Sequence, residues 1–180
     1  MVTVTEVMHF WFQELTPEQR FAKDDKLDEE ILARFGELQE QAARGECFSW
    51  RETIEGRLAE IIVLDQFSRN IYRNDPRSFA SDGMALVLAQ EAIRTGENVK
   101  LPAEQRGFLY MPLMHAESLV IHEEAVKYFS EPGLEQNLEF EHRHRDIILR
   151  FGRYPHRNQI LGRRSTADEL AFLKEPGSSF

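Results

Sequence analysis

Apolar residues recur at helical spacing along almost the whole chain. Between residues 25 and 44, Leu27, Ile31, Phe35 and Leu38 repeat every three or four positions, which places them on one face of an α-helix. The two-residue alternation that is typical of half-buried strands does not appear over a useful length. The pattern therefore predicts an all-α protein.

Capping residues and helix breakers divide this pattern into seven to eight helices. Thr16 with Gln19, and Thr166 with Glu169, have the spacing of a capping box, which marks the start of a helix. Pro112 is predicted to bend or break a helix before it reaches His115. The predicted long helices span about 5–15, 25–44, 53–65, 81–96, 101–115, 117–129 and 134–151, and a short one follows at 166–173.

Short connections between these helices favour antiparallel pairs, in which each apolar stripe packs on a neighbour. Two arrangements fit: a tetratricopeptide-like right-handed array of helix pairs, or an irregular bundle. No repeat with a 34-residue period supports the first. We expect residues 1–175 to form a single all-helical domain and residues 176–180 to form a loose C-terminal tail.

Composition narrows the class of protein. The 180 residues carry a net charge of −9, which argues against a general nucleic-acid binder. No apolar run is long enough to span a bilayer, and the first residues lack the features of a signal peptide. The single cysteine, Cys47, cannot form an internal disulfide. These features predict a soluble cytoplasmic protein without a membrane or nucleic-acid partner.

One segment reverses the overall charge. Residues 142–166 contain seven arginines and three histidines but only one acid, Asp146. With histidine neutral, the net charge of this segment is +6 and that of the rest of the chain is −15. Such a basic segment either pairs with the acidic surface of its own protein or holds an anion. Its arginines suit bidentate contacts to carboxylate or phosphate. The sequence leaves both alternatives open.

Asp65 stands where an apolar residue is expected. It lies on the same helix face as Leu58 and Ile61, with Arg69 one turn further on. A buried carboxylate is costly unless it is paired or hydrogen-bonded. Two interpretations remain open. Asp65 and Arg69 form an ion pair at the end of the helix, or Asp65 orients an Arg or His side chain that lines a pocket.

Three histidines are also predicted to point into the protein, where each has either a structural or a functional role. His115 and His122 share a stripe with Leu119 if the helix begins near His115, and His144 lies in the stripe of Ile147 and Ile148. They are either hydrogen-bonded core residues or members of one polar cluster with Asp65.

The spacing of these histidines does not suit a metal ion. His142 and His144 fall on different faces of a helix, and His115 and His122 are too far apart along one. No HExxH sequence, cysteine pair or glycine-rich phosphate loop occurs, so we expect neither a metal nor a nucleotide cofactor.

Four motifs together resemble a known family. FWF near the start, LDQFSRNIYR at 64–73, LYMPLMHAE at 109–117, and HRDIILRFGRYPHRN at 144–158 followed by LGRRST are similar, in this order, to the bacterial family called domain of unknown function 924. The resemblance runs from about residue 7 to residue 173. It implies a tetratricopeptide-like all-helical fold and no established activity.

The resemblance also implies which positions matter. Its motif positions fall on Asp65, Gln66, Arg69, Asn70, His115, Glu117, His144, Arg145, Arg153, His156, Arg157 and Asn158. His122 departs from the family pattern, where a glutamine is expected, and His142 does not belong to the motif. Membership of His122 in a functional cluster is therefore not implied.

Three hypotheses for function follow. In the first, an Arg/His-lined pocket on a concave helical surface binds an anionic small molecule or peptide group. In the second, Asp65 or Glu117 orients a histidine as an acid–base catalyst, with arginine stabilising negative charge. In the third, the polar motif only locks helix ends together. The candidate ligand-binding residues are Asp65, Arg69, His115, Glu117, His144, Arg153, His156, Arg157 and Asn158. The sequence does not indicate whether the protein is a monomer or an oligomer.

Overall fold

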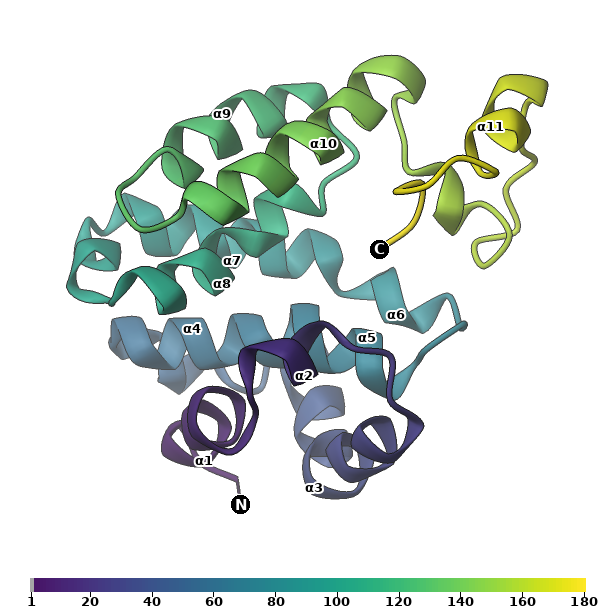
Figure 1. The fold of residues 1–180 in the computed structure, drawn as a ribbon. Coiled ribbons are helices and arrows are strands. Elements are labelled where there is room, and N and C mark those ends of the chain that lie inside the picture. Colours follow the sequence, from purple (N-terminus) through teal and green to yellow (C-terminus); the bar gives the residue numbers. More distant parts are fainter. Residues whose placement is uncertain (1) are drawn as a thin grey trace.

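A computed structural model describes residues 2–180, and every regular element of that range is helical. The prediction of an all-α protein is confirmed. The helices stack in tiers from α1–α3 at the bottom to α9 and α10 at the top, and a smaller lobe that contains α11 lies at one end (Figure 1). The elements are α1 (Val4–His9), η1 (Phe10–Glu14), α2 (Pro17–Phe21), α3 (Asp25–Ala43), η2 (Phe48–Glu52), α4 (Ile54–Ile62), η3 (Val63–Phe67), α5 (Ser68–Ile71), α6 (Arg77–Ala80), α7 (Asp82–Arg94), η4 (Glu97–Lys100), α8 (Ala103–Met114), α9 (Leu119–Phe129), α10 (Glu135–Phe151), η5 (Pro155–Arg157) and α11 (Ala167–Phe172).

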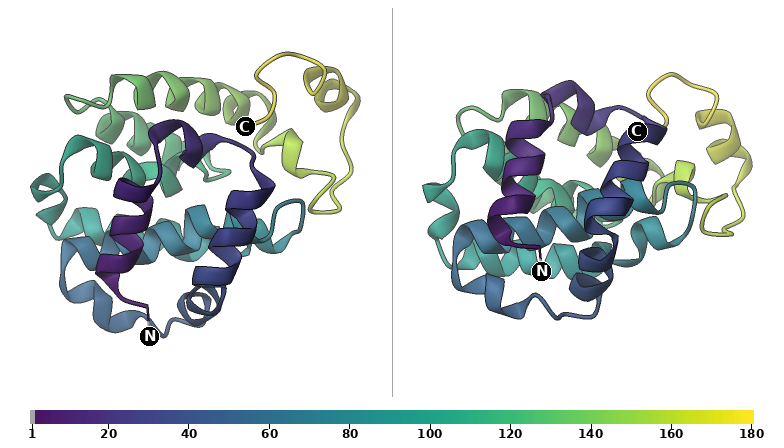
Figure 2. Two further views of the ribbon diagram at one scale, coloured as in Figure 1. Left: turned by 60° about the horizontal axis from the view of Figure 1, so that its bottom comes forward. Right: turned by 90° about the horizontal axis from the view of Figure 1, so that it is seen from below.

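The centre of the protein is one long helical rod made of α4, η3 and α5. Every residue from 58 to 68 is buried, because other helices pack around the rod on all sides. α1 crosses it near its start and α3 near its end (Figure 2), while α7 and α8 pack against the opposite face. The middle of the rod, η3, is a turn of π-helix, a feature that is frequent at functional sites.

Aromatic rings fill the space between the rod and the N-terminal helices. Phe67 of η3 is fully buried, and its ring centroid lies 4.8 Å from Phe35, 5.7 Å from Trp11 and 5.9 Å from Phe10. These residues belong to the main hydrophobic core. The apolar stripes that the sequence predicted for the first two helices therefore meet on the rod.

The predicted helix starts are confirmed at both capping boxes. The side chain of Thr16 accepts a hydrogen bond from the backbone of Gln19, and Thr166 accepts one from Glu169, with the reciprocal bonds also present. Gly45 and Gly96 follow α3 and α7 with φ of 78° and 74°, the left-handed conformation that ends a helix without strain at glycine.

The chain around residue 115 differs in part from the prediction. Pro112 does not break the helix, because α8 continues through it and ends at Met114. The next helix begins only at Leu119, which leaves His115 as the C-terminal cap residue of α8. His115 and His122 therefore do not share a helical stripe, and the turn at 115–118 sets the direction of His115.

The chain after α10 forms the smaller lobe. α9 and α10 lie side by side and run in opposite directions (Figure 1), and beyond Gly152 the chain turns into η5 and then α11. A second, smaller hydrophobic cluster consists of Ile147, Ile148, Tyr154 and Phe172. Residues 176–180, for which the sequence predicts a loose tail, turn back toward the rest of the molecule, where the ring of Phe180 stacks on His144 at 3.9 Å.

Candidate functional site

The carboxylate of Asp65 is the buried centre of a polar cluster. It is 1% exposed, and three side chains hold it: His115 Nδ1 lies 2.7 Å from Oδ1, Arg69 donates to Oδ1 at 3.1 Å, and Gln66 donates to Oδ2 at 2.8 Å. Arg69 also donates to the backbone oxygen of Asp65. The ion pair expected within the helix end is thus present, and the same carboxylate orients a histidine from another helix.

The hydrogen bond to Asp65 fixes the tautomer of His115. Burial would raise the pKa of Asp65, but His115 and Arg69 outweigh it and bring that pKa to about 2. Burial and the charge of Arg69 lower the pKa of His115 below its usual value. At neutral pH the pair is therefore a carboxylate and a neutral imidazole that carries its proton on Nδ1. Nε2 keeps its lone pair and has no hydrogen-bond partner within residues 2–180.

Arg69 and Arg157 approach the same acid from two directions. Asp82, the first residue of α7, accepts two hydrogen bonds from Arg69, at 2.8 and 2.9 Å. Arg157 comes from η5, and its Nη1 lies 3.6 Å from the same carboxylate. Arg69 is thus shared between Asp65 and Asp82, and Arg157 is the second cation beside Asp82.

Arg157 is a buried cation with few partners. Its side chain is 7% exposed and its Cζ lies 4.6 Å from the ring centroid of Phe79 and 4.7 Å from that of Tyr154. Nη2 donates to the backbone oxygen of His115 at 3.0 Å, but the buried Nε has no hydrogen-bond partner within residues 2–180. Burial and the charge of Arg69 lower the pKa of Arg157. The guanidinium thus lacks part of the compensation that buried charges need.

A cavity of about 380 Å³ lies beside this cluster, a volume within the range of small-molecule sites. We call it the Arg157 cavity. Its polar wall contains His115, Arg157, Asp82 and Glu117. The remaining lining residues are Pro76, Phe79, Ala80, Gly83, Leu86, Pro112, Ala116, Ser118 and Leu161.

Glu117, Arg153 and Asn158 belong to networks that hold the smaller lobe. Glu117 accepts from the backbone N–H of Tyr154 at 2.8 Å and from both terminal nitrogens of Arg163 at 2.7 and 2.8 Å. Arg153 and Asn158 both donate to Glu169, the capping residue of α11. Glu117 also lines the Arg157 cavity, whereas Arg153 and Asn158 do not.

His122 forms a separate pair inside the protein. Its Nδ1 lies 2.5 Å from Glu141 Oε1 and its Nε2 lies 2.7 Å from the backbone oxygen of Ala116, and both side chains are completely buried. Because each imidazole nitrogen faces an acceptor, a proton must lie between Nδ1 and the carboxylate. Burial raises the pKa of Glu141 above its usual value.

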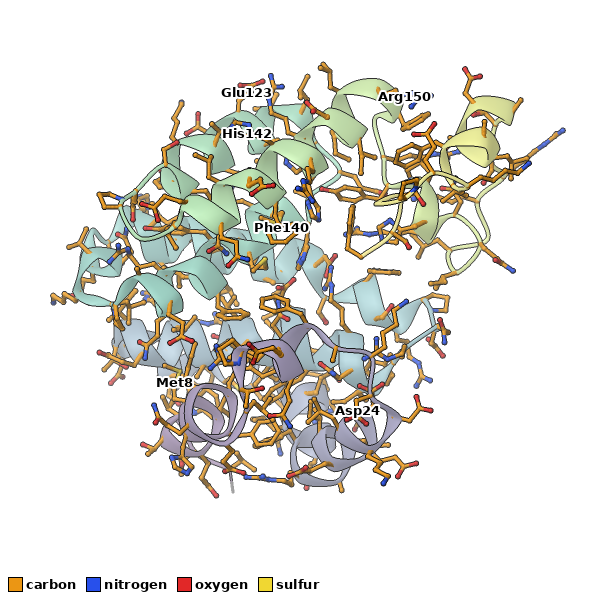
Figure 3. All side chains as sticks on the ribbon, viewed as in Figure 1. Met8, Asp24, Glu123, Phe140, His142 and Arg150 are labelled. Atoms are coloured by element: carbon orange, nitrogen blue, oxygen red, sulfur yellow. The ribbon has the colours of Figure 1, made fainter. Side chains whose placement is uncertain are left out.

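His144 and His156 both lie beside Tyr154, each with its ring centroid 5.7 Å from that of the tyrosine. The prediction that His144 points inward is confirmed, since it is 6% exposed and its Nδ1 donates to the backbone oxygen of Phe140 at 2.7 Å. His142 lies on the outer face of α10, as the two-residue spacing predicts (Figure 3). Burial lowers the pKa of both His144 and His156 to about 3, so both imidazoles are neutral at pH 7.

The basic segment pairs mainly with the protein's own acids. Bidentate contacts join Arg153 to Glu169 and Arg163 to Glu117, and Arg145 lies 2.5 Å from Glu123. Of the two alternatives that the sequence left open, self-pairing accounts for these three arginines and for Arg143, which pairs with Glu139. Arg157 differs from them because its one acidic neighbour, Asp82, lies 3.6 Å away.

Four residues in or near these polar groups were not predicted as site residues, namely Phe79, Asp82, Glu141 and Tyr154. For Glu141 a signal was available, since it lies seven positions before the buried Ile148 and therefore on the same helix face. For Asp82 no spacing rule indicates which arginine it meets, because the partner is on another helix.

Comparison with known proteins assigns the chain to a family. Residues 7–177 match the family described as "Bacterial protein of unknown function (DUF924)". The chain is a member of the DUF924 family. The resemblance that the four motifs indicated is thereby confirmed over nearly the whole chain.

A solved structure agrees with this membership. The protein of unknown function ATU0120 from Agrobacterium tumefaciens is 36% identical, with a TM-score of 0.90 over 95% of this chain and 96% of that one. No match was found among curated proteins. The DUF924 fold is thus supported by a related structure that carries no functional description.

Two properties of this DUF924 protein bear on the class of site. Across residues 2–180, no three His, Cys, Asp or Glu side chains gather in a way that could hold a metal ion. No helix in this range has the length and apolar character that crossing a bilayer requires.

Proposed function

We propose that this protein binds a small molecule through a carboxylate or phosphate group, which Arg157 holds in the wall of the Arg157 cavity. The observation that carries the proposal is the buried Nε of Arg157, which has no partner within residues 2–180. A planar carboxylate or phosphate supplies the paired acceptors that a guanidinium binds best.

The distribution of charge supports this assignment. The carboxylates of Asp82 and Glu117 are each engaged by two short hydrogen bonds from Arg69 and Arg163 respectively. Arg157 is left with one acid at 3.6 Å, shared with Arg69. An anion in the cavity would therefore give Arg157 close acceptors that Asp82 and Glu117 do not supply.

The first test is substitution of Arg157. We expect Arg157→Gln to weaken binding of inorganic phosphate at least about tenfold, the equivalent of one charge-assisted hydrogen bond. Isothermal titration calorimetry measures the affinity, and soaking crystals in sulfate locates the anion. Density within hydrogen-bond distance of the Arg157 guanidinium is the expected result.

The matched control is Arg164→Gln, which removes the same charge from an exposed position of the same segment. Thermal unfolding of both variants establishes that they are folded. Equal phosphate affinity in the two variants, or a sulfate that avoids Arg157 in the soaked crystal, would contradict the proposal.

A second candidate function is acid–base catalysis by His115. The observation that favours it is the 2.7 Å contact between Asp65 and His115 Nδ1, together with the position of His115 in the cavity wall. A carboxylate that fixes Nδ1–H leaves Nε2 as the proton acceptor, which is the arrangement of a histidine general base.

This candidate predicts a specific state of the imidazole. In ¹⁵N NMR spectra we expect His115 to be neutral at pH 7 with its proton on Nδ1, because burial and Arg69 lower its pKa. We expect Asp65→Asn to remove this tautomer preference. A His115 signal that titrates near the reference value of about 6.5, or that carries its proton on Nε2, would exclude this role.

A further inference from the structure

Phe180 packs among aromatic side chains outside the Arg157 cavity, where the C-terminal segment meets α10 and η5. The ring of Phe180 packs on that of His144, with centroids 3.9 Å apart and the two ring planes tilted by 30°. Its edge contacts are to His156, at 4.9 Å and 78°, and to Tyr154, at 5.8 Å and 88°. We call the space that Phe180 occupies between these three side chains the His144 slot.

Phe180 is held weakly in this slot. It remains 52% exposed, so it gains only part of the stabilisation of a fully buried aromatic ring. The segment after Gly177 is tied to the protein by one side-chain hydrogen bond within the described range, from Ser178 to the backbone oxygen of Leu173 at 3.2 Å. Phe180 can therefore leave the slot without unfolding a helix.

The slot contains hydrogen-bonding groups that a phenyl ring does not satisfy. His156 Nδ1 is buried and has no partner within residues 2–180, an arrangement that is rare because it forfeits a hydrogen bond to water. His144 uses Nδ1–H to reach Phe140, which leaves its Nε2 as an acceptor. Both imidazoles are neutral, since burial lowers their pKa to about 3. A ring can therefore stack on these imidazoles without the free-energy cost of burying a charge.

We propose that the His144 slot binds a flat nitrogen heterocycle that bears an amino or ring N–H group, and that Phe180 is a displaceable cap. Such a ring replaces Phe180 in the stack on His144. The centroid of the His156 ring lies 4.9 Å from that of Phe180, so a ring seated in place of Phe180 would bring an exocyclic group next to His156. The heterocycle thus provides both the stacking of Phe180 and the hydrogen bond that Phe180 leaves unmade.

The test uses 4-aminopyrimidine as the probe, with pyrimidine as the same ring without its amino donor. We expect Phe180→Ala to bind 4-aminopyrimidine about tenfold more tightly than the unaltered protein, because the slot no longer has to be vacated first. Pyrimidine should bind more weakly than 4-aminopyrimidine to both proteins. Chemical-shift titration of the histidine ring signals measures the affinities.

Two further variants test whether binding of 4-aminopyrimidine depends on the His144 slot. His156→Leu removes the hydrogen-bonding ring and should abolish the preference for the amino compound. His142→Ala, on the exposed face of the same helix as His144, should change nothing. Phosphate affinity at Arg157 should also be unaltered in Phe180→Ala, so failure here and failure of the proposed anion site are distinguishable.

Three results would overturn the proposal. One is an unchanged His144 ring signal in Phe180→Ala, which would mean that Phe180 does not occupy the slot in solution. Another is equal affinity for the two pyrimidines in the unaltered protein. The third is the absence of any binding to Phe180→Ala.

Discussion

Replacing His122 by alanine is expected to lower the free energy of unfolding by about 3–5 kcal/mol, the cost of breaking a buried ion pair by removing one partner. His122 and Glu141 are both fully buried, and Glu141 Oε2 already lacks a partner within residues 2–180. Without His122 the carboxylate would lose its hydrogen bond at Oε1 as well. Urea unfolding of the variant and of the unaltered protein measures the difference.

The loss should depend on pH. Burial raises the pKa of Glu141, and removing His122 takes away the interactions that oppose this shift. A carboxyl group whose pKa is raised in the folded state favours folding at low pH and loses that contribution as the pH rises through its folded pKa. The deficit of His122→Ala should therefore be smallest near pH 4 and grow toward pH 7.

A double variant provides the matched control. Replacing His122 and Glu141 together by leucine removes both polar groups, and such replacements of a buried pair are often neutral or stabilising. We expect it to recover most of the stability and to abolish the pH dependence. A double variant as unstable as His122→Ala would show that lost packing, and not the uncompensated carboxylate, causes the effect.

Replacing Phe67 by alanine is expected to cost about 3–5 kcal/mol of unfolding free energy, the typical range for removing a buried phenylalanine. Its ring is fully buried against Phe10, Trp11 and Phe35, which come from two different helices. Because all three neighbours are held by their own helices, the space left behind cannot close easily. Denaturant unfolding monitored by circular dichroism measures the loss.

Phe48→Ala is the matched control for this substitution. Phe48 is 68% exposed, so its removal should change stability by no more than about 0.5 kcal/mol. Similar losses in the two variants would contradict the assignment of Phe67 to the centre of the core.

The helices and their starts were predictable from the sequence, because spacing and capping are local properties. The stripe of Leu27, Ile31 and Phe35 identifies α3 directly, and Thr166 with Glu169 identifies the start of α11. The π-helical turn over Val63–Phe67 was not predictable, because these residues are buried on every side and no exposed face marks the helical period there. The tetratricopeptide-like arrangement that the family resemblance implied stays a prediction.

The candidate site was predictable only in part. The burial of Asp65 and the inward direction of His144 follow from helical spacing, and both are confirmed. The contact between Asp65 and His115 joins two different helices, so spacing within either helix does not predict it. The partner of Arg157 depends on how the smaller lobe docks on α7, which local spacing does not determine.

The site is assembled at a seam in the molecule. Asp65, Asp82 and His115 belong to the main body, whereas Arg157 comes from the smaller lobe, whose Tyr154 and Phe172 pack on Ile147 and Ile148 of α10 in a small apolar cluster apart from the main core. A part of a chain that is held by few buried apolar contacts can open as a cooperative unit of its own. A bound ligand that contacts both His115 and Arg157 would then hold the smaller lobe against the main body. It would slow amide hydrogen exchange throughout the smaller lobe as well as at the residues that it contacts.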